Sequence, residues 1–459
     1  MEIEKNIELL ENGNLLTQTE KEVFEMVYSR CNDFNPPVVA RAAGGWVRDK
    51  LLGKESDDID IAVENTTGLA FAENLKYKIK NDNIKIVVIE ANPDQSKHLE
   101  TARVCIFPDF WIDFCGLRSD SYTQDSRIPS IKQGTPMEDA KRRDFRMNAL
   151  FFNINTKKVE DFTNGIEDLK NGIINTPLDP IESFKDDPLR VLRAFRFASR
   201  FGFKLHESII PAAQKIHGDF KRKITRERIA TELIKAFDGI APLDTLIYLV
   251  ESGLFSPVFD RLDEWSLDPN EALKRVQTVV SRHPGNDRFL VLSLSAIYSP
   301  ILSNPKVSDP ERNHKKINAI EYAIARNLKM PVKVAYDVES ILTGAYELVK
   351  LEKNLTRLNV GRWIRHIGEL WKFSSLVVFD DDIYNFYINV VDPFIKEQRL
   401  EDVWEMKPLM NGVELANLHG IKPGKELKPL IEKLIDWQLE NPFGTAEEYI
   451  EYVNNQKNK

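Results

Sequence analysis

Two aspartates, Asp58 and Asp60, are spaced so that their side chains could act together. They belong to the segment Asp58-Ile-Asp-Ile-Ala-Val63, which begins with alternating polar and apolar residues. Such alternation predicts a β-strand, and side chains at positions i and i+2 leave a strand on the same face. Adjacent carboxylates repel unless a cation lies between them, and Mg²⁺ prefers one or two carboxylates together with phosphate oxygens. We predict catalytic, metal-binding roles for both aspartates; an ordinary acidic pair at a strand end is the alternative.

A glycine pair upstream of these aspartates fits phosphate binding. Gly44 and Gly45 lie between a short extended run and a helix-like segment, Trp46–Leu52. Glycines at such a junction let backbone N–H groups approach an anion, and Arg48, one turn later, could add a charge-assisted contact. The sequence contains neither G-x-G-x-x-G nor a Walker A motif, which argues against Rossmann dehydrogenases and P-loop ATPases. A tight turn with a surface arginine is the alternative.

A predicted helix that starts near Asp187 carries a second candidate site. Asp187 and Arg190 are spaced i and i+3, so they would be neighbours on one helix face. Cytosine and adenine present an amino donor beside a ring-nitrogen acceptor, whereas uracil and guanine present the reverse pattern. A carboxylate beside a guanidinium matches cytosine and adenine, and a mismatched base would leave buried polar groups unpaired. An aspartate at a helix start with an ordinary intrahelical ion pair is the alternative.

Two further features accompany these groups. Arg193 and Arg196 continue a basic ridge along the same predicted helix, with apolar residues on the opposite face. Asp113 lies in the predicted strand Phe110–Leu117 among apolar neighbours, where an ionised group needs a cation or hydrogen-bond partners. A surface aspartate on an edge strand is an equally good interpretation of Asp113.

The order of the motifs resembles a known family. G-G-x-x-R-D followed by D-x-D resembles the nucleotidyltransferase head of the DNA polymerase β superfamily. Further segments resemble motifs of class II CCA-adding enzymes, the tRNA nucleotidyltransferases of eukaryotes and most bacteria, and their wording is eukaryotic in style. These segments are Arg142–Ala149, Asp161–Leu169, Asp186–Phe197, Arg226–Ile229 and Gly420–Gly424.

The resemblance implies template-independent addition of C, C and A to the 3′ end of tRNA from CTP and ATP, with release of pyrophosphate. It implies a two-metal Mg²⁺ site on Asp58 and Asp60, with Asp113 near the attacking hydroxyl as a base or a metal ligand. The nucleotide site that it implies comprises Gly44, Gly45, Arg48, Arg143, Asp144, Asn148, Asp187, Arg190, Arg193 and Arg196. Surface ion pairs are the alternative interpretation of Arg142-Arg143-Asp144.

The sequence leaves two other functions open. The alternative within the same enzyme class is a partial C- or A-adding enzyme or a poly(A) polymerase. The one from a different class is an inactive RNA-binding protein on the same scaffold, although the intact D-x-D argues against it.

The elements that would position these residues predict an α+β fold with an N-terminal mixed-sheet nucleotidyltransferase head and an all-helical neck, body and tail. We expect a head over 1–155, a neck with the nucleotide-selecting helix over 156–240, a body over 241–375 and a tRNA-binding tail over 376–459. Arg118–Lys141 is polar and loop-like, Asn148–Asn155 predicts a strand, and Lys315–Asn327 predicts a helix. The resemblance makes 118–141 the family's flexible loop.

Composition limits the remaining possibilities. The 459 residues carry a net charge of −8, yet the stretch from Asp186 to Lys235 has twelve basic and six acidic residues, a net of +6 that suits a nucleic acid. Three cysteines argue against a disulfide framework and for a reducing compartment. The longest uncharged stretch, Phe289–Pro305, is shorter than the roughly 20 residues of a membrane helix. We expect tRNA as partner, no membrane, a monomer, and a cytoplasmic protein without a clear targeting segment, although nuclear or mitochondrial pools are compatible.

Overall fold

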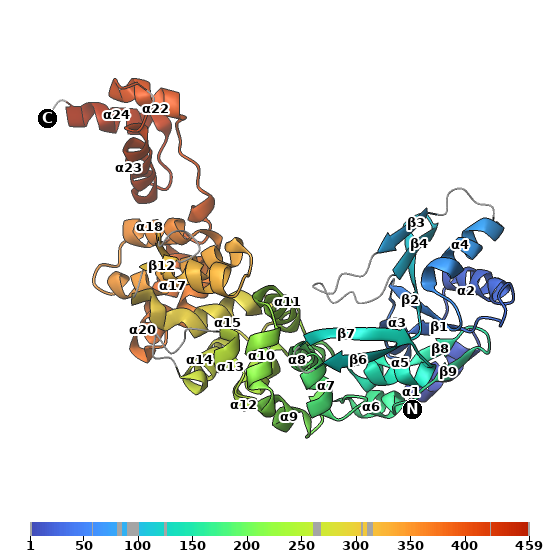
Figure 1. Ribbon diagram of the computed structural model, residues 1–459. Helices are drawn as coiled ribbons and strands as arrows, with labels where there is room; N and C mark the ends of the chain where they lie inside the picture. The colour runs from blue at the N-terminus through green and yellow to red at the C-terminus, as the bar shows by residue number, and fades with distance from the viewer. Residues whose placement is uncertain are drawn as a thin grey trace. The chain divides into compact units, whose positions relative to one another are not determined.

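The computed structural model describes residues 2–56, 58–79, 85–89, 101–123, 126–259, 268–303, 306–309, 315–422 and 424–457. The chain forms two compact units, residues 1–259 and 260–459 (Figure 1). The predicted α+β class is confirmed, because a mixed sheet occupies the N-terminal part and helices dominate the rest. The finer division at residues 155, 240 and 375 stays a prediction.

A seven-stranded sheet in the order β3-β4-β5-β2-β1-β8-β9 forms the head. All neighbouring strands are antiparallel except β2 and β5, which are parallel. Every strand predicted for this part of the chain is present, and only the bounds differ. The strands are β1 (Ala40–Ala43), β2 (Ile59–Val63), β3 (Lys85–Ile89), β4 (Thr101–Phe107), β5 (Phe110–Gly116), β8 (Phe151–Asn153) and β9 (Lys158–Glu160).

Helix α4 (Gly68–Ile79) packs against β4 and β5 on one face of the sheet (Figure 1). The ring of Phe71 on this helix lies 5.4 Å from that of Phe114 on β5. Alternate residues of β4, such as Ala102 and Val104, are fully buried beneath the helix. Period-two burial of apolar residues therefore fixes which face of the sheet the polar residues occupy.

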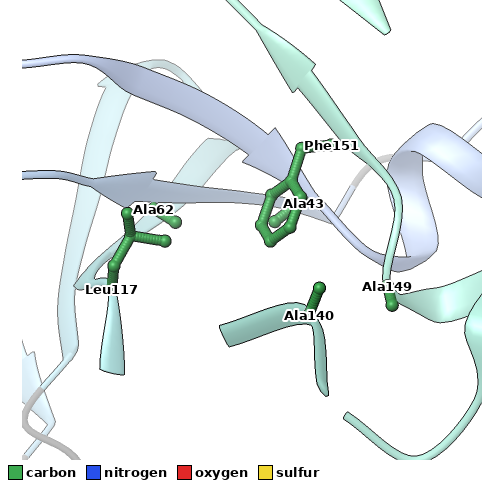
Figure 2. Close-up of a cluster of buried hydrophobic side chains, with 6 residues drawn as sticks. All are labelled: Ala43, Ala62, Leu117, Ala140, Ala149 and Phe151. Atoms are coloured by element: carbon green, nitrogen blue, oxygen red, sulfur yellow. The ribbon is translucent and has the colours of Figure 1, made fainter. Parts of the chain in front are cut away.

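A cluster of buried hydrophobic side chains, four alanines with Leu117 and Phe151, joins the segments that surround the end of β1 (Figure 2). Ala43 and Ala62 come from the sheet, Ala140 from helix α5 (Pro136–Arg142), and Ala149 from the turn before Phe151. Alanine side chains leave room for α5 to pack near the sheet. The cluster thereby holds the segments around Gly44, Arg143 and Asn148 together.

The stretch predicted to be loop-like over 118–141 is regular, so this prediction was wrong. Strands β6 (Arg118–Thr123) and β7 (Ser126–Gln133) form an antiparallel hairpin, and α5 follows with a capping box of Thr135 and Glu138. A two-stranded hairpin outside the main sheet needs no buried apolar face, so its sequence lacks the alternation that reveals a core strand.

The predicted strand over Asn148–Asn155 is shorter than expected. Asn148 instead ends the 3₁₀ helix η2 (Arg146–Asn148), and β8 starts at Phe151.

After the sheet, the first unit continues with helices. Helix α8 (Leu189–Phe201) packs against α11 (Arg226–Phe237) and α12 (Pro242–Glu251). The other elements are α6 (Gly165–Asn171), α7 (Pro180–Asp186), α9 (Ile209–Lys215), α10 (His217–Lys223), α13 (Phe255–Phe259), and the parallel pair β10 (Ile173–Ile174) and β11 (Lys204–Leu205).

The second unit is mostly helical. Part of the predicted helix Lys315–Asn327 is wrong, because β13 (Lys315–Asn318) pairs with β12 (Lys306–Asp309) and the helix begins only at Ala319, capped by Asn318. Within the described ranges, no helix is long and apolar enough to cross a bilayer. The main helices are α14 (Pro269–Arg282), α15 (Phe289–Tyr298), α17 (Val332–Leu351), α18 (Arg357–Ile367), α20 (Asp381–Phe386), α21 (Asp392–Glu397), α22 (Gly412–His419), α23 (Leu427–Glu440) and α24 (Ala446–Lys457).

Before the sheet, α1 (Glu2–Glu11) and α2 (Gln18–Cys31) fasten the short helix α3 (Gly45–Leu51). Glu20 of α2 is 2% exposed and accepts a hydrogen bond from Trp46 Nε1 at 2.8 Å. Its carboxylate also lies 3.0 Å from Lys50 Nζ, and Lys50 is itself buried. Lys50 Nζ also lies 2.7 Å from the carboxylate of Glu55, but Glu55 is exposed, so Glu20 is the buried partner of this lysine and a sensitive point of the fold.

We expect Glu20→Ala to lower the free energy of unfolding by about 1–3 kcal/mol, because Lys50 would lose its buried partner and keep only the exposed Glu55. Glu22→Ala on the exposed side of the same helix is the control and should change it by less than about 0.5 kcal/mol. Urea unfolding followed by circular dichroism measures both. Equal midpoints for the two variants would contradict the role of the buried pair.

Candidate active site

Asp60 and Asp113 lie directly opposite each other in the sheet. Parallel pairing of β2 with β5 makes them register partners, so their side chains leave the same face, and Asp58 immediately precedes β2. Asp60 remains accessible to solvent. Partial loss of hydration is the main cause that raises the pKa of Asp60 to about 6. The charges of Asp113 and Asp58 also raise this pKa, whereas the charge of Arg143 lowers it. The three predicted catalytic carboxylates thus share one face of the sheet.

The chemistry of these carboxylates fits a divalent cation. The charges of Asp58 and Asp113 disfavour the ionised form of Asp60, and a cation beside Asp60 would relieve this repulsion. In the part of the chain that the structure describes, no group of three or more His, Cys, Asp or Glu residues could hold a metal by itself. Mg²⁺ suits such a sparse set, because it accepts substrate phosphates and water as its other ligands.

Gly44 forms the turn between β1 and α3, next to Asp60. Its φ of +69° lies in the region that favours glycine. A Cβ atom at this position would lie 2.7 Å from Arg143 Nη1 and 3.3 Å from the carbonyl oxygen of Asn148. Ala43, the residue before Gly44, is the register partner of Asp60. Because Gly44 has no side chain, Arg143 and Asn148 can lie close to the backbone beside the carboxylates.

Gly44 and Gly45 line a cavity of about 770 Å³ in the first unit. Of the ten residues predicted to bind nucleotide, all but Arg196 line this cavity; the catalytic aspartates lie outside its lining. The cavity is large enough for a nucleotide, since small-molecule pockets measure roughly 300–1,000 Å³.

Arg48 is more firmly held than the predicted phosphate clamp. It is 4% exposed and donates two hydrogen bonds to the Asp49 carboxylate, at 2.8 and 2.9 Å, and a third to Asn148 Oδ1. Its guanidinium also lies 5.4 Å from the ring centre of Phe197 and 4.9 Å from that of Phe201. Arg48 thus joins α3 to α8, with part of its guanidinium left for a ligand.

Arg143 and Asp144 belong to the pocket wall, so the surface ion pairs considered for them do not describe their setting. Arg143 donates to Asp139 at 2.9 and 3.0 Å and to the carbonyl oxygen of Asn148 at 3.2 Å. Asp144 accepts from Asn148 Nδ2 at 3.0 Å and forms an ion pair with Arg193. Burial by itself would raise the pKa of Asp144, but Arg193 and Asn148 hold it at about 2.

Asp187 and Arg190 both line the cavity, but the predicted i, i+3 relation within one helix is wrong. Asp187 closes α7 with an extended backbone, and Pro188 separates it from α8. Its carboxylate accepts from Leu189 N at 3.1 Å and from Arg228 Nη2 at 2.9 Å. The intrahelical ion pair offered as the alternative is therefore not what holds Asp187.

Arg190 has partners of its own. It donates to Ser183 Oγ at 2.8 Å and to the carbonyl oxygen of Arg142 at 2.6 Å. No ion pair joins it to Asp187 among the described residues. The two charged groups are thus fixed separately on the wall of one cavity.

Arg193 and Arg196 take different places. Arg193 lines the cavity, whereas Arg196 lies behind it, in an ion pair with Glu232 at 2.7 Å and over the Phe197 ring at 4.2 Å. Glu232 also lies 3.8 Å from Arg193 Nη1. The basic ridge predicted along α8 is therefore split between a cavity side and a buried side.

Several lining residues were not predicted. Arg118 and Asp120 come from β6, within the stretch predicted to be a loop, so no signal of regular structure drew attention to them. The others come mainly from α11 and the residue before it, where the Arg226–Ile229 motif was the available signal. They are Arg142, Leu189, Phe197, Thr225, Glu227, Arg228, Thr231 and Glu232.

Comparison with known proteins agrees with this geometry. Residues 40–175 match the family model described as the Poly A polymerase head domain, and residues 202–266 match a probable RNA- and SrmB-binding site of polymerase A. A tRNA nucleotidyltransferase of Schizosaccharomyces pombe is 34% identical over 451 residues, covering 91% of this chain and 92% of that protein. The chain belongs to the tRNA nucleotidyltransferase family. The predicted family membership and enzyme class are thereby confirmed.

Other tRNA nucleotidyltransferases are also similar to this chain in sequence or in fold. The protein named CCA tRNA nucleotidyltransferase, mitochondrial, of Saccharomyces cerevisiae is 33% identical over 485 residues, covering 91% of this chain and 88% of its own. The fold matches the Thermotoga maritima CCA-adding enzyme complexed with tRNA, with a TM-score of 0.70 at 20% identity over 99% and 98% of the two chains. It also matches a CCA-adding enzyme in complex with CTP, with a TM-score of 0.66 at 21% identity over 100% and 99%.

We expect Gly44→Ala to weaken CTP binding at least about tenfold, because the new methyl group would displace Arg143 and strain the turn. Gly218→Ala is a matched control, since a Cβ at Gly218 would meet nothing within 4 Å. Equilibrium dialysis with labelled CTP measures both. Unchanged binding in Gly44→Ala would show that the turn does not shape the nucleotide site.

The pKa of Asp144 gives a prediction about pH. Because its folded-state pKa is held at about 2, below the ordinary 3.8, the ionised carboxylate stabilises the fold by about 2 kcal/mol at neutral pH. This stabilisation is present above pH 4 and is lost as the pH falls towards 2. Asp144→Asn should therefore be less stable than the parent by about 2 kcal/mol at pH 7, with a gap that shrinks below pH 4. Urea unfolding across this pH range tests it, and a gap independent of pH would contradict it.

Proposed function

We propose that this enzyme completes the 3′ end of tRNA by adding C, C and A from CTP and ATP without a nucleic-acid template. The observation that carries the proposal is the separate anchoring of Asp187 and Arg190 on one wall of a nucleotide-sized cavity. The full-length similarity to proteins named CCA tRNA nucleotidyltransferases supports the same activity.

The two anchored side chains would read the base. Asp187 Oδ1 accepts from Leu189 N at 3.1 Å and from Arg228 Nη1 at 3.5 Å, whereas Oδ2 accepts only from Arg228 Nη2 among the described residues, which leaves acceptor capacity chiefly on Oδ2. Arg190 uses one N–H of each Nη group, which leaves Nε and the second N–H of each group for a ligand. An acceptor and a donor presented side by side match cytosine and adenine and leave uracil and guanine with unpaired polar groups.

Other residues of the cavity would hold the triphosphate. Gly44 and Gly45 expose backbone at the carboxylate end, and Arg143 is fixed by Asp139, so its charge is already in place before a ligand binds. Preorganised charge of this kind stabilises a transition state without reorganisation during the reaction. Arg48 would act mainly by supporting Asn148 and α8.

The reaction joins the RNA 3′-hydroxyl oxygen to the α-phosphorus and breaks its bond to the bridging oxygen, so that pyrophosphate leaves. Asp58 and Asp60 would hold two Mg²⁺ ions, which supply neutralising charge and lower the pKa of the hydroxyl. Asp113, beside Asp60 in the sheet, would receive the hydroxyl proton or complete the metal ligands. Orientation by the cavity walls would supply much of the rate.

tRNA is the proposed RNA partner. Arg222 on α10 exposes 57% of its side chain and Lys221 is also exposed, whereas Lys223 is turned inward, where it donates to the carbonyl oxygen of Lys185. Exposed cations of this kind suit backbone phosphates. We further propose a cytoplasmic monomer, with nuclear or mitochondrial pools; the three cysteines are free thiols, as expected in a reducing compartment.

The test is nucleotide dependence on tRNA that lacks its 3′-terminal CCA. We expect incorporation of C with CTP alone, completion to CCA with CTP and ATP together, and none with UTP or GTP. Asp60→Ala should lower the rate by at least about 10³-fold and Asp58→Ala similarly, which excludes a contaminating enzyme. Addition of C only, A only or long A tails would favour the partial enzymes or a poly(A) polymerase, and absence of any addition would favour an inactive RNA-binding protein.

A further inference from the structure

The two faces of the head sheet are unequal around the catalytic aspartates. Along β4, Ala102, Val104 and Ile106 are buried under α4, whereas Thr101, Arg103 and Cys105 alternate with them and are half-exposed. On β5, Trp111 and Asp113 are half-exposed in the same way. Among the described residues, the face that bears the carboxylates is therefore open beyond β5, on the side of β4 and β3.

A single row of side chains crosses this open face. The strand registers place Ala43 opposite Asp60, Asp60 opposite Asp113, and Asp113 opposite Arg103. The cavity adjoins the Ala43 end of the row through Gly44. A nucleotide in the cavity therefore reaches the aspartates from one end of the row, and the hydroxyl that attacks it must arrive from the other end, where Arg103 lies.

Arg103 has partners at this position but keeps part of its guanidinium available for a ligand. Its Nε lies 3.5 Å from Asp113 Oδ1, its guanidinium lies 5.6 Å from the ring centre of Trp111, and 42% of its side chain is exposed. Neither Nη group has a hydrogen-bond partner among the described residues. A guanidinium that stands beside Asp113 at ion-pair distance, with both Nη groups open, suits a phosphate, and an accessible indole beside it suits a base, because every base has a stacking face.

We infer that Arg103 and Trp111 form the subsite for the 3′-terminal nucleotide of the RNA substrate. Arg103 contacts the phosphate of that nucleotide, and Trp111 stacks on its base, which places the ribose hydroxyl over Asp113. The inference rests on the proposed function, since it presupposes an RNA primer. The 3′ end of the RNA would thus bind at β4 and β5. These strands are separate from the elements that carry the residues proposed to select the incoming nucleotide.

The test compares two tRNA transcripts that lack CCA, one with its 3′-terminal base and one with an abasic 3′-terminal nucleotide that keeps its hydroxyl. Filter binding gives the Kd of each for the parent protein, Trp111→Leu, Arg103→Ala and Arg103→Lys. Tyr77→Leu, which removes a 76% exposed aromatic from α4 on the other face of the sheet, is the control. Thermal midpoints confirm that each variant is folded.

We expect the abasic change to weaken binding by the parent about tenfold, and Trp111→Leu to weaken binding of intact tRNA by a similar factor and to be insensitive to the abasic change. Arg103→Ala should weaken both RNAs equally and reduce the slope of log Kd against log salt by about one, while Arg103→Lys retains most of that slope. The KM for CTP should stay within about twofold in Trp111→Leu, because the nucleotide cavity is untouched.

A tenfold abasic effect that persists in Trp111→Leu, or an unchanged salt slope in Arg103→Ala, would overturn the assignment while the parent still added C, C and A. A parent protein that adds no nucleotide to intact tRNA would instead mean that the proposed function fails. Loss of RNA affinity in Tyr77→Leu would show that binding is spread over both faces, which also overturns it.

Discussion

Seven arginines line one cavity of the first unit, and their mutual repulsion is the constraint around which that unit is built. Like charges at such density destabilise a fold unless each is balanced. The balance comes from carboxylates placed beside them: Asp49 for Arg48, Asp139 for Arg142 and Arg143, Asp144 for Arg193, and Asp187 for Arg228. Two of these five pairs, Asp144 with Arg193 and Asp187 with Arg228, join segments more than 40 residues apart, so the contacts that balance these charges also assemble the site.

The balance leaves the cavity able to bind an anion. Most of these arginines have partners on one side of the guanidinium and keep further N–H groups available, because arginine has five donors. The ring of Phe197 supports the arrangement, since Arg48, Arg193 and Arg196 all lie within 5.5 Å of its centre. A charged wall that is fixed before the ligand arrives loses little entropy on binding, which suits a pocket for a triphosphate.

Family membership and the local geometry explain different things. The match to the Poly A polymerase head domain over residues 40–175 covers the sheet and the three carboxylates. In the function that we propose, the choice between bases would depend on Asp187 at the end of α7 and Arg190 on α8, with Arg228 of α11 holding Asp187. The proposed chemistry and the proposed selection would thus reside on separate elements, and the ion pair of Asp144 with Arg193 joins the segment after α5 to α8.

The sequence alone determined the features that depend on local periodicity. Alternation along 58–63 predicted one strand of the sheet, 110–117 was predicted as another, and the glycine pair at Gly44 predicted the turn beside the cavity. These predictions succeed because a strand with one buried face, or a turn with a positive φ, restricts which residue types can occupy a few neighbouring positions.

Only the tertiary structure decided which distant groups meet. The parallel pairing that brings Asp113 beside Asp60, the Arg228 partner of Asp187 and the hairpin that carries Arg118 all join segments whose contact leaves no short-range pattern. Helix α8 likewise begins only after Pro188, so Asp187 lies outside the helix in which its spacing from Arg190 had placed it. Spacing along the chain tells which side chains can share a face, whereas packing and charge balance between distant segments tell which ones do.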